Sequence, residues 1–154
     1  MATRQINHAY AVLLCSQFQG FCRDLHSECG GAIAMNLPTG HREVAKIQFQ
    51  HARKLDRGNP NKGNLGSDFG RFGFKFWDHV HAADARNAVR SGKLEELNLW
   101  RNAIAHQDWQ GVGGDPALRL VRVNGWRMAL NALAPAFDRV MREQVRVIRG
   151  TPPW

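Results

Sequence analysis

The sequence lacks an apolar stretch long enough to cross a membrane. A transmembrane helix needs about 18 or more largely apolar residues, and the apolar patch near the N-terminus is interrupted by Gln and Asn. No small-residue cleavage site follows that patch cleanly, so a secretory signal peptide is not indicated. These absences favour a cytoplasmic protein.

Cysteine is scarce: only Cys15, Cys22 and Cys29 occur. Seven residues on a helix span about 10.5 Å, too far for a disulfide, so reduced thiols are expected. His26 would share a helical face with Cys22 and Cys29, but a structural zinc needs four ligands and no partner pair is evident. We predict that these side chains line a helix interface. No metal and no cofactor are predicted.

Acidic residues are also few, with 13 Asp and Glu against 21 Lys and Arg and a formal net charge of +8. This excess favours a polyanionic partner such as RNA, because cationic side chains bind the phosphate backbone. A basic surface that serves only solubility is the alternative. The arginines of the C-terminal segment leave the same choice open: Arg127, Arg139, Arg142, Arg146 and Arg149.

The spacing of apolar residues predicts an all-α protein with four to five helices in one bundle. The expected helices cover about 4–28, 41–55, 74–90, 93–106 and 124–149, with Gly30-Gly31 as a stop signal, Ser91 as an N-cap and a kink at Pro135. Residues 118–123 are the only candidate strand. We expect one domain over 1–150 and a short tail at 151–154.

Residues 56–73 are rich in Gly, Asn and Pro and are predicted to form a long loop. The pattern G-x-x-x-x-G-K-[S/T] is absent, which excludes a P-loop. Cations alternate with aromatic residues here, which suits the binding of unpaired RNA bases. Alternatively, the aromatics return the loop to the core. The candidate RNA-binding residues are Lys62, Arg71 and Lys75.

The segment LWRNAIAHQDW contains Arg101, the polar Asn102 beside it, and His106. This pattern, within a predicted helical array, resembles the motif of the HEPN superfamily, in particular the RiboL-PSP-HEPN type. The resemblance covers most of the chain. It implies a HEPN-like helical bundle, a metal-independent endoribonuclease and a homodimer with a composite active site, and it suggests a toxin or defence effector with an antitoxin or regulatory partner.

The chemistry of the three residues agrees with that resemblance. Histidine can transfer protons near neutral pH, and arginine presents a planar fork to phosphate oxygens. Positions five apart on a helix differ by about 140°, so Arg101 and His106 do not share a face, whereas Asn102 and His106 do. We predict that His106 transfers protons, Arg101 stabilises phosphate charge and Asn102 orients, giving a 2′,3′-cyclic phosphate and a 5′-hydroxyl.

Three alternatives remain open. Arg101 and His106 could simply place positive charge at the end of a helix, where it is favourable. A HEPN-like domain can also be a non-catalytic module that binds nucleic acid or a protein. A metal-dependent hydrolase that uses the His and Cys residues is a third possibility, which full activity in a chelator would exclude.

Overall fold

The computed structural model describes residues 2–154, which form six α-helices and no strand. The helices are α1 (Ala2–Ala34), α2 (Thr39–Gln50), α3 (Lys62–Phe69), α4 (Phe76–Ala83), α5 (Asn87–His106) and α6 (Leu120–Arg149). Three 3₁₀ turns lie between them: η1 (Lys54–Asp56), η2 (Gly70–Phe72) and η3 (Gln110–Val112). The all-α prediction is confirmed, with one helix more than expected. None of the helices in residues 2–154 is long and apolar enough to cross a bilayer.

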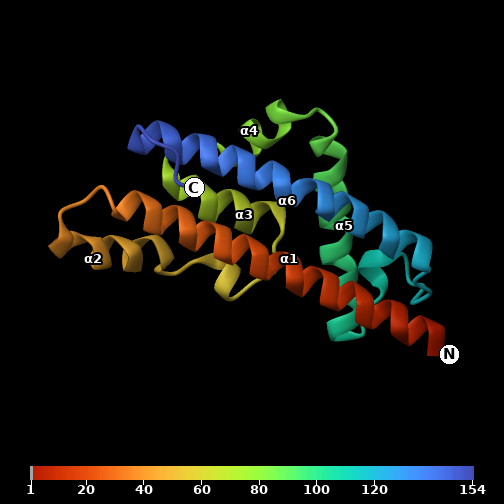
Figure 1. Ribbon diagram of the computed structural model, residues 1–154. Helices are drawn as coiled ribbons and strands as arrows, with labels where there is room; N and C mark the ends of the chain where they lie inside the picture. The colour runs from red at the N-terminus through yellow and green to blue at the C-terminus, as the bar shows by residue number, and fades with distance from the viewer. Residues whose placement is uncertain (1) are drawn as a thin grey trace.

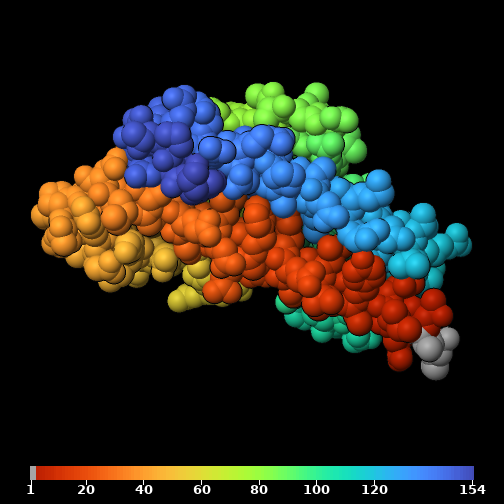
Figure 2. Space-filling model, viewed as in Figure 1, coloured from red at the N-terminus to blue at the C-terminus, as the bar shows by residue number. Residues whose placement is uncertain are grey.

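The two longest helices, α1 and α6, run side by side in the same direction, and α5 crosses behind them (Figure 1). Near their N-terminal ends, Asn7 donates from Nδ2 to the carbonyl oxygen of Leu118, the second residue before α6. In the space-filling view, α1 and α6 cover most of one face, and only an edge of the segment near the end of α5 emerges below α1 (Figure 2). The motif end of α5 therefore lies at the margin of this layer.

The core lies where α1, α3, α4 and α6 meet. The rings of Phe69 and Phe76 stack with centroids 4.6 Å apart, and Phe137 of α6 contacts Phe76 edge-on at 4.9 Å. Phe18 of α1 reaches the same ring of Phe137 at 5.7 Å. Such aromatic pairs each add about 0.5–1.5 kcal/mol beyond the burial of their area. This cluster joins the beginning of the chain to its last helix.

The predicted stop at Gly30-Gly31 is wrong, because α1 continues to Ala34. Gly30 has another role: a Cβ on it would lie 3.1 Å from Cβ of Phe49 in α2. The glycine thus lets α2 pack close against α1. α2 itself is shorter than predicted and ends at Gln50, and no residue of it is buried. Leu55, which was expected in the same helix, is fully buried in η1.

The predicted loop at 56–73 is also wrong in part, because α3 and η2 lie inside it. Asn61 caps α3, since its Oδ1 accepts a hydrogen bond from the backbone N–H of Asn64 at 2.8 Å. Leu65 and Phe69 of this helix are fully buried. The glycine-rich composition concealed a short helix whose apolar residues are four apart and face the core.

The break between α4 and α5 lies at 84–86 and not at Ser91, which is inside α5. Asp84 makes the turn by accepting from the backbone N–H of Arg86 at 2.9 Å. Asn87 satisfies the end of α4 by donating from Nδ2 to the carbonyl oxygen of Val80 at 2.8 Å. The N-cap predicted at Ser91 is therefore wrong, since α5 begins at Asn87 and its N-cap position is Arg86.

α6 begins at Leu120, so the candidate strand at 118–123 is wrong. Leu118 and Val123 are buried while Leu120 and Val121 are exposed, which does not fit the alternation of a strand. Asp115 opens only a turn, in which its Oδ1 accepts from Ala117 N at 2.8 Å. The helix continues through Pro135 to Arg149.

Candidate functional site

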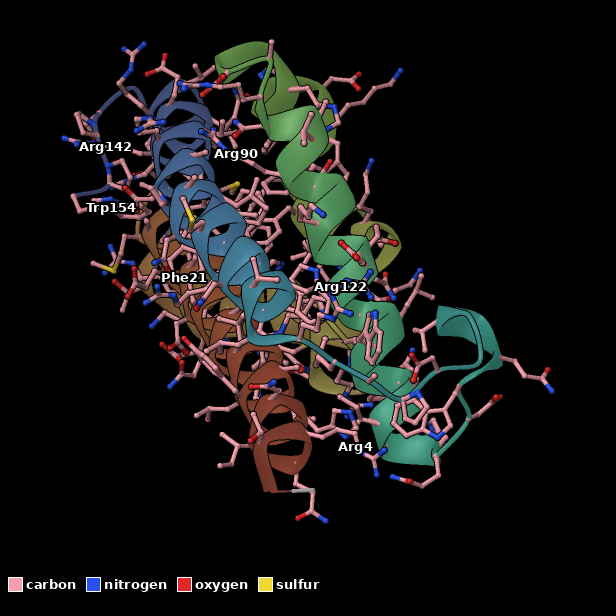
Figure 3. The ribbon with its side chains drawn as sticks, turned by 90° about the vertical axis from the view of Figure 1, so that its right-hand side faces the viewer. Arg4, Phe21, Arg90, Arg122, Arg142 and Trp154 are labelled. Atoms are coloured by element: carbon pink, nitrogen blue, oxygen red, sulfur yellow. The ribbon has the colours of Figure 1, made fainter. Side chains whose placement is uncertain are left out.

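The motif residues occupy the last two turns of α5. Asn102 and His106 are exposed and Arg101 is partly buried, while the neighbouring Trp100 and Ala103 are buried. The helix ends directly after His106, because Gln107 adopts a left-handed conformation with φ of 54° and donates from its N–H to Ala103. The chain then folds back beside the helix through η3 (Figure 3).

Two adjoining hollows flank the motif. The Arg101 hollow has a volume of about 350 Å³ and is lined by Gln19, Asp56, Arg57, Gly58, Asn59, Arg101 and Asn102. The His106 hollow is smaller, about 210 Å³, and is lined by Leu99, Asn102, Ala103, His106, Asp108 and Gly111. Asn102 lines both, whereas Arg101 and His106 line different hollows. This agrees with the expected angle between the two side chains on a helix.

Asn102 is held by a residue far away in the sequence. Nδ2 of Asn59 donates to Oδ1 of Asn102 at 2.6 Å, and the guanidinium of Arg101 reaches the same oxygen at 3.3 Å. The Asn102 side chain is therefore oriented on both sides. The position of the Asn102 side chain therefore depends on Asn59, in the segment before α3. The motif sequence alone does not indicate this contact.

The segment 59–62 lies along a polar row of α5. Besides Asn102, this row includes Asn98, which donates to the carbonyl oxygen of Pro60 at 3.3 Å, and Glu95, which accepts from the backbone N–H of Lys62 at 2.6 Å. Positions three and four apart share a helical face, so one face of α5 binds this segment at three successive points. Asn59 is consequently presented at the motif end of the helix.

Residues 55–58, which precede this segment, are bonded to side chains of α1. Gln19 donates from Nε2 to the carbonyl oxygens of Leu55 and Gly58, at 2.6 and 2.9 Å. Asp56 pairs with Arg53 at 2.7 Å and with Arg23 at 3.0 Å. The hydrogen bond from Arg53 is the main cause of the lowered pKa of the Asp56 carboxyl. Residues 56–59 line the Arg101 hollow and form its wall, and these contacts hold the wall against α1.

A buried carboxylate supports the same wall from beneath. Asp68 of α3 is fully buried and accepts from the backbone N–H groups of Lys54 and Leu55, at 2.9 and 2.8 Å. Its carbonyl oxygen lies 3.1 Å from Nε2 of His26, which is also fully buried. Since a carbonyl only accepts, Nε2 carries the hydrogen. Burial, followed by the nearby Arg53 guanidinium, lowers the pKa of His26 to about 4.

The other side of α5 is held against α6. Arg122, labelled in Figure 3, lies 5.5 Å from the ring centroid of Trp100 and 3.4 Å from Glu96. Glu96 also accepts from the indole of Trp126 at 3.0 Å. Burial alone would raise the pKa of Glu96, but hydrogen bonds from Trp126 and Lys93 outweigh it and lower the pKa. Thus Glu96 and Trp100 join α5 to α6, whereas Glu95, Asn98 and Asn102 join it to the segment 59–62.

The cysteines are free and buried, as predicted for residues at a helix interface. Cys15 lies beneath the motif, with its Sγ 3.6 Å from Oδ1 of Asn98. Burial raises the pKa of Cys15 to about 11, although the charge of Arg101 partly opposes this. Burial likewise raises the pKa of Cys29 to about 12. Within residues 2–154, no three His, Cys, Asp or Glu side chains lie close enough together to hold a metal ion.

The structure places the three candidate RNA-binding residues in different settings. Arg71 donates to the carbonyl oxygens of Phe49, His51 and Ala52 and so caps the end of α2. The ammonium of Lys62 lies 5.5 Å from the centroid of the Trp77 ring. Lys75 is exposed just before α4. None of the three lines either hollow.

The aromatic residues around these cations belong to the core. Phe69, Phe72 and Phe76 are buried, and Phe74 and Trp77 pack against the same cluster. The burial of these aromatic side chains confirms the second interpretation, in which they return the segment to the core.

Sequence reasoning missed Asn59, Gln19 and Glu95, which shape the site without belonging to the motif. The run Asn59-Pro60-Asn61 carried a usable signal, because asparagine is favoured just before a helix. That signal predicts the start of α3, but not the contact of Asn59 with α5. The pairing arises only when the segment crosses the helix.

Comparison of the chain with protein-family models, with curated proteins and with solved structures finds no match.

Proposed function

We propose that the protein is a metal-independent endoribonuclease of the HEPN type. The observation that supports this most is the placement of Arg101, Asn102 and His106 around two adjoining hollows at one end of α5. In the proposed reaction His106 transfers protons, Arg101 stabilises the negative charge on the phosphorus centre, and Asn102 orients the RNA. The 2′-hydroxyl attacks the adjacent phosphate, which leaves a 2′,3′-cyclic phosphate and a 5′-hydroxyl.

The reaction is proposed to take place in a homodimer. Within one chain, neither hollow holds both the proton-transferring His106 and the charge-stabilising Arg101. Because Arg101 and His106 line different hollows, a second copy would bring its own His106 toward the Arg101 of the first. Leu99, whose side chain is 53% exposed in the His106 hollow, is an apolar contact that such a copy would cover.

The net charge of +8 supports RNA as the substrate class. In a HEPN-type setting the protein would act in the cytoplasm as a toxin or defence effector, and a toxin requires a neutralising antitoxin or regulator.

The main alternative is a non-catalytic HEPN-like module that binds nucleic acid or a protein partner. The separation of Arg101 and His106 into two hollows within one chain favours this alternative, since neither hollow alone holds both groups. Binding of RNA without cleavage is its expected behaviour.

The test is cleavage of structured RNA in EDTA by the wild type and by Arg101→Ala and His106→Ala. Matched controls are Arg4→Ala and His41→Ala, which change exposed residues that line neither hollow. We expect cleavage by the wild type and both controls, and loss of at least about a hundredfold in each motif variant. Equal cleavage by wild type and motif variants, or no cleavage by the wild type, would refute the enzyme proposal.

A further inference from the structure

The Asn59–Asn102 pair has one free acceptor and one free donor, on two side chains that are hydrogen-bonded to each other and line the same hollow. Nδ2 of Asn59 is used in the hydrogen bond to Oδ1 of Asn102. Within residues 2–154, Oδ1 of Asn59 and Nδ2 of Asn102 have no hydrogen-bond partner, although both residues line the Arg101 hollow. The internal bond determines which atoms remain free, because flipping either amide would break it.

A neighbouring acceptor and donor are the complement of a nucleobase edge. Asparagine binds adenine in this way in DNA recognition, and unpaired RNA bases expose their Watson–Crick and Hoogsteen edges to side-chain amides. The same geometry would bind a peptide amide, but the charges around the hollow favour a phosphate-bearing ligand. An RNA nucleotide satisfies both requirements.

The charges come from Arg57 and Arg101, which line the same hollow. Neither forms an ion pair within the described part of the chain. Asp56, the hollow's carboxylate, is already paired with Arg23 and Arg53. The hollow therefore offers two cations to a phosphate next to two amides for a base.

The backbone around Asn59 is fixed independently of its side chain. Its carbonyl oxygen accepts from Nδ2 of Asn64 and from the N–H of Asn61, both at 2.8 Å. A Cβ on Gly58 would lie 2.7 Å from Nδ2 of Asn64, so glycine at this position lets that amide reach the carbonyl oxygen of Asn59. Replacing the Asn59 side chain should therefore alter the amide pair and leave the turn in place.

From these observations we infer that the Asn59–Asn102 pair binds the base of one unpaired RNA nucleotide in the Arg101 hollow and sets the base preference of the protein. The inference rests on the proposed function for its choice of RNA as ligand. It assigns Asn59 as a specificity residue and Arg57 as a phosphate contact, and neither residue belongs to the motif.

The experiment measures binding of fluorescent 2′-O-methyl trinucleotides whose central base is A, C, G or U. These probes lack the attacking hydroxyl, so affinity is read by anisotropy without any cleavage. For the wild type we expect the best and worst bases to differ by about fivefold or more. Asn59→Ala should reduce that difference to less than about twofold. Asn59→Asp cannot donate to Oδ1 of Asn102 and should change the order of the bases.

Asn131→Asp is the matched control, because it makes the same change at an exposed residue of α6 that lines neither motif hollow. It should preserve the wild-type order, and thermal melting confirms that each variant is folded. Equal affinity for all four probes in the wild type, or an unchanged preference in both Asn59 variants, overturns the inference. A base preference that depends on Asn59 in a protein that does not cleave RNA refutes the ribonuclease and retains the binding site.

Discussion

Asn59, at the end of a turn, donates to Asn102 on α5 over 2.6 Å, across 43 positions of the chain. This bond connects the motif to a wall that α1 and α3 hold in place. The orientation of the Asn102 side chain therefore depends on residues outside the motif.

Asp68→Asn should destabilise the protein by about 2 kcal/mol. The carboxylate accepts from two backbone N–H groups in the core, and an amide can present only one oxygen and leaves one donor facing another. Urea denaturation measures the change in the free energy of unfolding. Asp24→Asn, at an exposed residue of α1, is the control and should change it by less than about 0.5 kcal/mol. An equally small effect of Asp68→Asn would show that the two hydrogen bonds from Lys54 and Leu55 to the carboxylate contribute little to stability.

The stability of the protein should fall as the pH drops from about 6.5 to about 4, in part because of His26. Its pKa in the folded protein is about 4, below the ordinary value of 6.5, so folding favours the neutral ring. This contribution is complete above the unfolded pKa and is lost as the pH falls toward the folded one. The total is about 3 kcal/mol.

His26→Gln isolates that contribution, because its amide can still donate to the carbonyl oxygen of Asp68 but does not titrate. Denaturation of the wild type and the variant at several pH values gives the measurement. The wild type should lose more stability than His26→Gln over this interval. Parallel curves for the two proteins would show that His26 is not the source of the pH dependence.

Arg71 and Lys75 should behave differently although both were candidates for RNA binding. Arg71→Met removes the donors to the carbonyl oxygens at the end of α2 and should cost about 2 kcal/mol of stability. Lys75→Met changes an exposed side chain and should cost less than about 0.5 kcal/mol. Melting curves and RNA affinity are measured on both variants. If Arg71→Met is as stable as the wild type, the hydrogen bonds from Arg71 to the end of α2 do not stabilise the protein.

The three thiols should resist alkylation in the folded protein. All are buried, and burial raises the pKa of Cys15 to about 11 and of Cys29 to about 12, so almost no thiolate is present near neutral pH. Mass spectrometry after iodoacetamide treatment should find no adduct in buffer and three in denaturant. Rapid labelling of Cys15 under native conditions would indicate that the region under the motif opens.

Mixing two inactive variants tests the composite site. Arg101 and His106 line different hollows, so a site that pairs Arg101 of one copy with His106 of another can form in a mixed dimer. Arg101→Ala and His106→Ala, inactive alone, should regain up to about a quarter of wild-type activity when mixed in equal amounts, because half of the dimers are mixed and each has one intact pair. Mixing Arg101→Ala with Arg101→Ala/His106→Ala is the control and should stay inactive. Cleavage no greater than in this control would exclude pairing across two copies.

Local sequence signals determined much of the secondary structure. The apolar spacing predicted α1 and most of α6, since Trp126, Leu130 and Phe137 recur on one face and are buried. It also placed Arg101, Asn102 and His106 on a helix, with the first and last pointing in different directions. The cysteines are buried, as predicted for residues that line a helix interface. These features depend on residues within a few turns of each other, which a sequence displays directly.

The tertiary structure decided what the local signals could not. Gly30 reads as a stop, but Phe49 packs against it from another helix and the helix continues. The sequence suggests that Arg71 is a free cation, but it donates to three carbonyl oxygens at the end of α2. Asn59 reads as a loop residue, but it meets Asn102 when the segment crosses α5. Each outcome depends on a partner many positions away, and contacts of that range become defined only when the core brings the helices together.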